Sequence, residues 1–124
     1  MAGKFISFTL IVILLTTACT ISKNHQERIN LPQETTVETA KKIVATVVND
    51  GFFNKISNKF PELNPKEDGI SIVSGFTEGS SGPKDVHILI GIKYTGKHYD
   101  AKEIATYGKG LVEEYLKDYF GNKT

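Results

Sequence analysis

The chain has 124 residues, 15 of them basic and 14 acidic, and 40% of its residues are hydrophobic. That length allows one domain and a short export segment, but not two domains. The nearly neutral balance argues against a nucleic-acid-binding protein, which needs a basic surface, and against a polybasic membrane-binding segment.

A signal peptide is the clearest functional feature of the sequence. Lys4 precedes a mostly apolar run over residues 5–15, and small residues at 16–18 lead to Cys19. A basic start, a short apolar centre and a small-residue exit are typical of a secretory signal peptide. The apolar run is too short to cross a membrane, which takes about 20 apolar residues.

Residues 14–19, with the sequence LLTTAC, resemble the lipobox of bacterial lipoproteins. The resemblance implies that the sulfur of Cys19 is diacylated, with chains such as palmitate, and that the chain is cut just before it. The mature protein would then be lipid-anchored at the extracytoplasmic face of the cell membrane. Ala18 fits the family pattern, whereas Thr16 stands where the family prefers an aliphatic residue.

Two other fates of the leader stay open. An ordinary signal peptidase would release a soluble protein, and an uncleaved segment would act as an anchor. Cys19 is the only cysteine, whereas exported domains tend to use cysteines in disulfide pairs. A single cysteine at the cleavage point favours lipidation, and two acyl chains make such an anchor stable. The excess of lysine over arginine, 14 to 1, is typical of a Gram-positive source.

The sequence divides into a signal peptide (residues 1–18), a lipid-attached tether (residues 19–34) and an α+β domain (residues 35–124). Residues 20–34 carry few large apolar side chains and include Pro32, as expected of a tether. Fully extended, they would reach about 50 Å from the membrane. We therefore expect their deletion to leave the thermal stability of the domain unchanged.

The domain opens with a predicted helix. Thr35 and Glu38 form a capping box before valines at helical spacing, and Asp50 and Gly51 stop the helix. The following segment mixes prolines with apolar residues. Its residues 54–60 fit either a short helical turn or a third strand.

Two strands are predicted next. Residues 70–76 and 86–94 alternate between apolar and other side chains, the period-2 pattern of a strand with one buried face. Residues 78–85 between them indicate a loop longer than a tight hairpin. His87 belongs to the face opposite the apolar row, which should face solvent.

A helix over residues 101–120 closes the domain. Its two internal glycines each disfavour the helix by up to ~1 kcal/mol relative to alanine. Gly108 lies in the apolar stripe, which predicts close approach to the sheet, whereas Gly110 has no such reason. The order α-β-β-α predicts a single small α+β domain with two helices packed on one face of a small antiparallel sheet. Because two strands alone are marginal in water, either residues 54–60 add a strand or a sheet edge pairs with a partner.

The sequence offers no catalytic or metal-binding constellation. The three histidines, His25, His87 and His98, lack the spacing of a zinc site, and no serine lies in a nucleophile motif. Adjacent carboxylates at 67–68 and 113–114 are typical of a turn and of a solvated helix face. We expect no metal, no cofactor and no enzymatic activity.

Two surface features remain to be weighed. Tyr115 and Tyr119 share a helix face, which fits either a protein interface or core tyrosines whose hydroxyls reach solvent. A cluster of His98, Asp100 and Glu103 inside a cleft would instead favour an enzyme.

Together these features predict a membrane-tethered extracytoplasmic lipoprotein that acts as a non-enzymatic protein-interaction module at the cell envelope, for example of the exclusion or immunity type. The partner would be a protein or a second copy, bound through a sheet edge or the tyrosine-bearing face, and not nucleic acid. The alternative is a small-ligand-binding or sensing lipoprotein with a groove between the last helix and the sheet. Four residues would line that groove: Leu111, Tyr115, Ile88 and Ile90. A preformed cavity there would favour ligand binding, and a filled core with an open strand edge would favour interaction.

Overall fold

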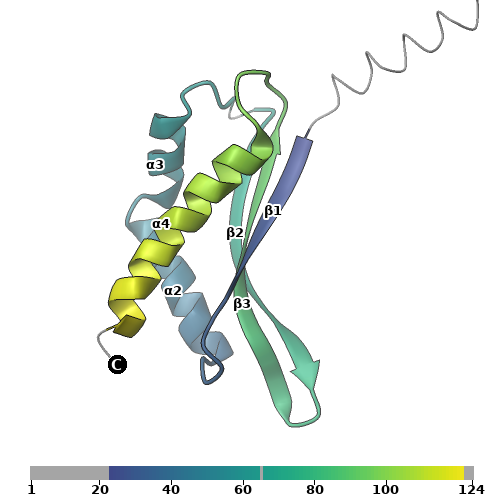
Figure 1. The fold of residues 1–124 in the computed structure, drawn as a ribbon, viewed down its shortest axis with the longest axis vertical. Helices are drawn as coiled ribbons and strands as arrows, with labels where there is room; N and C mark the ends of the chain where they lie inside the picture. The colour runs from purple at the N-terminus through teal and green to yellow at the C-terminus, as the bar shows by residue number, and fades with distance from the viewer. Residues whose placement is uncertain (1–22, 65, 122–124) are drawn as a thin grey trace, which may run out of the picture.

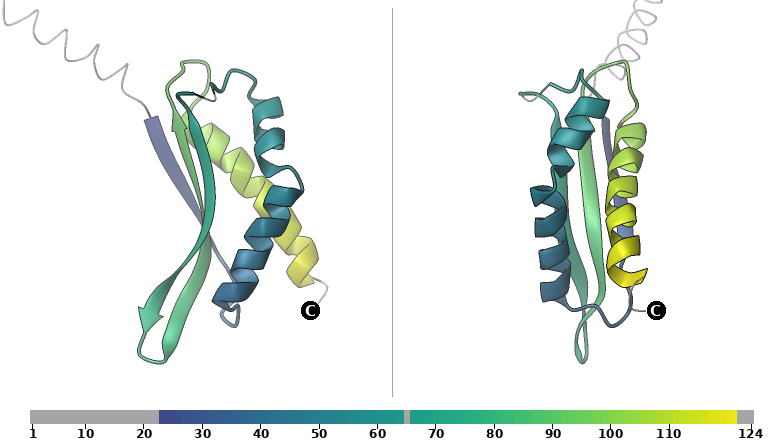
Figure 2. Two further views of the ribbon diagram at one scale, coloured as in Figure 1. Left: turned by 180° about the vertical axis from the view of Figure 1, so that it is seen from behind. Right: turned by 90° about the vertical axis from the view of Figure 1, so that its left-hand side faces the viewer.

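The computed structural model describes residues 23–64 and 66–121. In chain order it contains β1 (Lys23–Asn30), α2 (Val37–Asn49), α3 (Phe52–Lys59), β2 (Gly69–Gly79), β3 (Gly82–Tyr94) and α4 (Ala101–Gly121). The strands form one antiparallel sheet in the order β1-β3-β2, and the helices cover one of its faces (Figures 1 and 2). The expected α+β class is confirmed, but the described chain has three strands and the order β-α-α-β-β-α.

β1 overturns the interpretation of residues 19–34 as a tether. It pairs with β3 from Lys23↔Tyr94 to Asn30↔His87, and it forms one edge of the sheet. Ile29 and Leu31 lie in the core with 6% and 8% of their surfaces exposed. The strand was missed because its other inward positions are polar, so the period-2 pattern of apolar residues is absent.

The first two helices form one row over the sheet. α2 begins one residue later than the predicted capping box, because the Thr36 hydroxyl, and not that of Thr35, accepts from the Thr39 N–H at 3.1 Å. Gly51 has a φ of 93°, a left-handed conformation that suits glycine and lets the chain turn directly into α3. Of the two alternatives for residues 54–60, the helical turn is the correct one.

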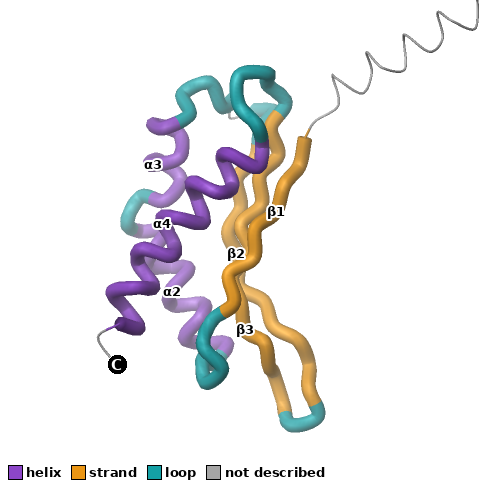
Figure 3. Tube along the Cα trace, viewed as in Figure 1, coloured by secondary structure: helices purple, strands orange, loops and turns teal. Residues whose placement is uncertain are grey.

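β2 and β3 form a long hairpin whose tip projects beyond the helices (Figure 3). The strands stay paired as far as Gly79↔Gly82, so the predicted long loop over residues 78–85 is wrong. Gly82 has a φ of 118°, which favours the tight turn that glycine permits. A register shift between Gly75 and Thr77 marks a bulge, at which Asp85 has a φ of 50°.

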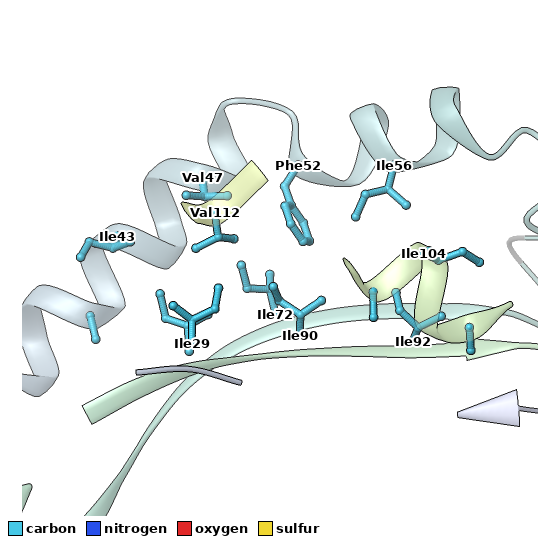
Figure 4. Close-up of a cluster of buried hydrophobic side chains, with 14 of the residues drawn as sticks. Ile29, Ile43, Val47, Phe52, Ile56, Ile72, Ile90, Ile92, Ile104 and Val112 are labelled. Carbon is cyan, nitrogen blue, oxygen red and sulfur yellow. The ribbon is translucent and has the colours of Figure 1, made fainter. Parts of the chain in front are cut away.

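The core lies between the sheet and the helices (Figure 4). The predicted apolar row of β3 is confirmed, since all its members are at most 6% exposed: Val86, Ile88, Ile90, Ile92 and Tyr94. Gly108 of α4 faces this row. An added Cβ there would lie 3.3 Å from Ile56 and 3.4 Å from both Ile90 and Phe52, so the expected close approach to the sheet is confirmed.

Gly110, two residues after Gly108, lies on the opposite side of α4, away from any such constraint. It is exposed, and an added Cβ would meet nothing within 4 Å. We expect Gly110→Ala to stabilise the domain by about 0.5–1 kcal/mol, because alanine loses less backbone entropy in a helix. Thermal denaturation should show a rise in midpoint of a few degrees. A fall would mean that the helix needs flexibility at this position.

Candidate functional site

The sheet face opposite the helices is uncovered in the described chain (Figure 2). We call it the open face. Strand pairing places three cross-strand rows along it, with Asn24, Lys93 and Gly69 first, Gln26, Gly91 and Ser71 second, and Arg28, Leu89 and Val73 third. Val73 is 50% exposed, so apolar surface lies on the β2 side of this face.

His87 lies on the open face as predicted, but it is only 7% exposed, so the expectation that it faces solvent is wrong. Its ring covers Gly75, where an added Cβ would lie 2.7 Å from His87 Nε2. Its Nδ1 is 2.7 Å from the carbonyl oxygen of Asp85. The imidazole therefore packs flat against the sheet, and a glycine on the neighbouring strand gives it room.

A shallow hollow of about 540 Å³ lies at the other end of the open face. Its floor includes Gly69 and Gly91, which have no side chains, and Lys93 and Ser71 stand at its sides. The two glycines lower the floor, because a side chain at either position would rise from this face. An ammonium and a hydroxyl around a flat floor suit an anionic oxygen group better than an apolar ligand.

The second candidate surface is the free edge of β2, which among the described strands pairs only with β3. A groove of about 340 Å³ runs beside this edge, and we call it the edge groove. Six residues of α3, the following loop and β2 line it: Phe53, Ser57, Leu63, Asn64, Asp68 and Ile70. Three large hydrophobic residues of the described chain are more than a third exposed, and they are Phe53 in this groove and Val73 and Phe76 on β2 itself.

Hydrogen bonds of Asp68 fix the backbone immediately before β2. Its carboxylate accepts hydrogen bonds from the backbone N–H of Asn64 and of Thr95, both at 2.7 Å, and from the Thr95 hydroxyl at 2.9 Å. Burial acts to raise the pKa of Asp68, but these hydrogen bonds and the nearby charge of Lys93 outweigh it and lower the pKa. The predicted turn at residues 67–68 is thus a structural one.

A small ionic cluster lies between β1 and α4. His25 Nε2 is 2.5 Å from one carboxylate oxygen of Glu27, and Lys109 Nζ is 3.5 Å from the other. The hydrogen bond with His25 is the main cause of a lowered Glu27 pKa, against which partial burial acts, and the charge of Lys109 lowers it further. Because Glu27 is paired with both His25 and Lys109, β1 can hold these polar side chains on its inward side.

The lowered Glu27 pKa has a consequence for stability. Its contribution is fully present above the ordinary glutamate pKa of about 4.3 and is lost as the pH falls through the lower folded-state value. We expect Glu27→Gln to destabilise the domain at pH 6 and to have a smaller effect near pH 3, as measured by urea denaturation. A constant difference between the two pH values would contradict the assigned ionic role.

His98, Asp100 and Glu103, whose clustering inside a cleft would favour an enzyme, are all exposed. His98 is largely exposed and pairs with Glu62, with its Nε2 3.1 Å from the carboxylate. The backbone N–H of Lys102 lies 3.4 Å from the Asp100 carboxylate, which suits a helix start. Across the described residues no group of three or more histidine, cysteine, aspartate or glutamate side chains is placed to hold a metal ion.

The groove predicted between α4 and the sheet is not open. Ile88 and Ile90 are fully buried in the core. Leu111 and Tyr115 instead line a groove of about 490 Å³ between the helices, together with charged residues that include Lys55 and Asp118. A filled core with an open strand edge is the arrangement expected of an interaction module.

The tyrosine-bearing face of α4 is partly occupied by its own contacts. The rings of Tyr115 and Tyr119 are 5.9 Å apart, and Tyr119 also meets Phe120 edge-on at 4.9 Å. All three are half-buried against the core. This face is therefore less available than the free edge of β2.

Cys19 and the predicted signal peptide lie outside the described residues. Among residues 23–64 and 66–121, no helix is both long and apolar enough to span a membrane. No known protein family, curated protein or solved structure matches this chain. The class that the coordinates define is a small antiparallel α+β domain with helices on one face.

Proposed function

We propose that the protein is a membrane-tethered extracytoplasmic lipoprotein whose domain is a non-enzymatic protein-interaction module. The observation that carries the proposal is the free edge of β2, which is flanked by apolar surface: Phe53 is exposed in the edge groove, and Val73 and Phe76 are exposed on the two faces of β2. Exposed strand edges with apolar surface associate readily with an extended segment of another chain.

The dimensions of the two layers support addition of one strand at this edge. α2 and α3 form one helical row and α4 the other (Figure 2). Two rows of helices need about 16–20 Å at 8–10 Å per helix, whereas three strands span about 14 Å. The helical layer is thus wide enough for one more strand beside β2, below α3, where the edge groove lies.

The composition of β2 also favours pairing. Its residues from Gly69 to Thr77 carry no charge, and the strand contains no proline. Monomeric proteins usually protect an edge strand with lysine, proline or short length. A partner segment would pair its backbone with β2 and place alternate apolar side chains in the edge groove against Phe53 and Leu63.

Site-specific photo-cross-linking in the host membrane tests this proposal. A benzoylphenylalanine residue in place of Phe53 should form a discrete protein adduct, and the same residue in place of Thr106, which is exposed on α4, should not. Intact-mass measurement of the same preparation should give a chain that begins at Cys19 and carries a diacylglyceryl group. Adducts from Thr106 alone would move the interface away from β2, and an unmodified Cys19 would refute the membrane tether.

A further inference from the structure

The position of β1 greatly shortens the distance between Cys19 and the folded domain. Three residues separate Cys19 from Lys23, the first residue of β1. Even fully extended, this stretch of chain spans about 14 Å, in place of the tether of about 50 Å expected when residues 20–34 are unstructured. If Cys19 carries the lipid, as proposed above, the domain lies against the membrane surface.

Three cations of the sheet, Arg28, Lys84 and Lys93, lie on its open face. The contacts that a side chain at Gly79 or Gly69 would make show on which face the nearby lysines lie. An added Cβ at Gly79 would lie 3.1 Å from the Lys84 side chain, and one at Gly69 would lie 4.0 Å from the Cβ of Lys93, which places both lysines on the open face. Arg28 pairs with Leu89 on the same face, and its guanidinium bonds to Asn30 at 2.9 Å.

The paired rows of the open face contain no carboxylate. The acidic residue of β1, Glu27, faces α4 and is paired with Lys109. On β2, Glu78 alternates away from Thr77 and Gly79, which belong to the open face. The carboxylate that lies nearest Lys93, Asp68, is bound to backbone N–H groups of Asn64 and Thr95.

We infer that the open face of the sheet lies against the anionic lipid headgroups of the membrane that holds the protein. This inference rests on the lipid anchor of the proposed function. Attraction of basic side chains to an anionic bilayer acts within a Debye length, about 8 Å at physiological ionic strength. A tether of at most ~14 Å keeps the end of the open face that carries Lys93 near that range. Arg28 and Lys84, farther along the strands, come within it when this face lies flat on the bilayer.

The hollow at the end of the open face fits the same ligand. Asn24 and Lys93 line it, and the next pair along the strands, Lys23 and Tyr94, marks the start of β1. The hollow is therefore at the end of the sheet from which the chain leads back to Cys19. Its ammonium, amide and hydroxyl groups can bind the phosphodiester of an anionic lipid. In this orientation the open face is against the membrane, and the free edge of β2, at the side of the sheet, stays accessible to a protein partner.

Fluorescence quenching in vesicles tests the orientation. The acylated protein is reconstituted into phosphatidylglycerol vesicles that contain a headgroup spin-labelled lipid, with a nitrobenzoxadiazole dye on Ser71→Cys or on Thr106→Cys. Both positions are exposed, the first on the open face and the second on α4. We expect quenching at Ser71→Cys to be several-fold stronger than at Thr106→Cys, and to fall in phosphatidylcholine vesicles or at high salt.

Matched charge variants make the test specific. The triple variant Arg28→Gln, Lys84→Gln, Lys93→Gln should reduce quenching at Ser71→Cys to the level of Thr106→Cys. The control removes three exposed lysines from the helices: Lys42→Gln, Lys102→Gln and Lys117→Gln. It has the same net charge and should leave the quenching unchanged.

Several outcomes would overturn the inference. Equal quenching at both dye positions in an acylated protein would refute it while leaving the lipid anchor intact. Shielding of the open face in cell membranes but not in vesicles would mean that an acidic protein covers it, which also refutes the lipid assignment. An unacylated Cys19 in the starting material would refute the anchor itself and the inference with it.

Discussion

Ile90→Asp is expected to leave the domain without a cooperative thermal transition. Ile90 lies at the centre of the central strand β3, is 0% exposed, and pairs with Ile72 on one side and Glu27 on the other. An aspartate there would be buried against Gly108 and would face the like charge of Glu27. Burial of an unpaired carboxylate costs several kcal/mol, close to the whole stability of a small domain of about 5–10 kcal/mol.

Circular dichroism during heating measures this effect on the chain that begins at residue 19. Val73→Asp provides the matched control, because Val73 is 50% exposed on β2 and the charge would stay in water. We expect the control to unfold cooperatively within a few degrees of the unmodified chain. A cooperative transition for Ile90→Asp would mean that the assigned register of β3 is wrong.

Deletion of residues 20–31 is also expected to unfold the domain, contrary to the expectation that these residues form a tether. The deletion removes β1, which covers one edge of β3 and lies next to α4. It also removes Ile29 and Leu31 from the core, each worth about 1.5–3 kcal/mol of burial. The remaining two-stranded sheet would be marginal in water.

A graded pair of substitutions separates packing from chain length in β1. Ile29→Ala should destabilise the domain by about 2–4 kcal/mol through the cavity it leaves. Its neighbour Arg28 is exposed on the open face, so Arg28→Ala should change stability by at most about 0.5 kcal/mol. Urea denaturation of both variants would show the contrast, and equal effects would argue against the alternation of β1.

The parts of the fold that could be predicted are those with strong local patterns. β3 alternates over nine residues, and its apolar row is buried as the period requires. The apolar stripe of α4 also placed Gly108 correctly against the sheet. Both succeed because a face that buries many apolar side chains must repeat at the spacing of its own backbone.

Elements that depend on distant partners could not be predicted. β1 carries Lys, Asn, His, Gln, Glu and Arg, and it becomes a strand because β3 offers it an edge and because His25 and Lys109 pair with Glu27. The tight turn at Gly79 and Gly82 was mistaken for a longer loop because both arms of the hairpin project into solvent and have polar sequences.

The candidate surfaces also depend on contacts between distant segments and not on local sequence patterns. Composition indicated a nearly neutral chain, but a net charge contains no information on where the charges lie. Strand pairing places Arg28, Lys84 and Lys93 on one face of the sheet, and packing of α3 brings Phe53 beside the edge of β2. Neither grouping is visible along the chain, because its members lie up to 65 residues apart (Arg28 to Lys93).

The sequence by itself therefore predicted an export signal and a lipidation site at Cys19, and it determined the α+β class and the buried row of β3, because each depends on residues close together in the chain. Only the tertiary structure decided that residues 23–30 belong to the sheet, that one sheet face and the edge of β2 are uncovered in the described chain, and that β1 begins four residues after Cys19. These properties arise from pairing between distant segments, which fixes both what is buried and what stays free to bind.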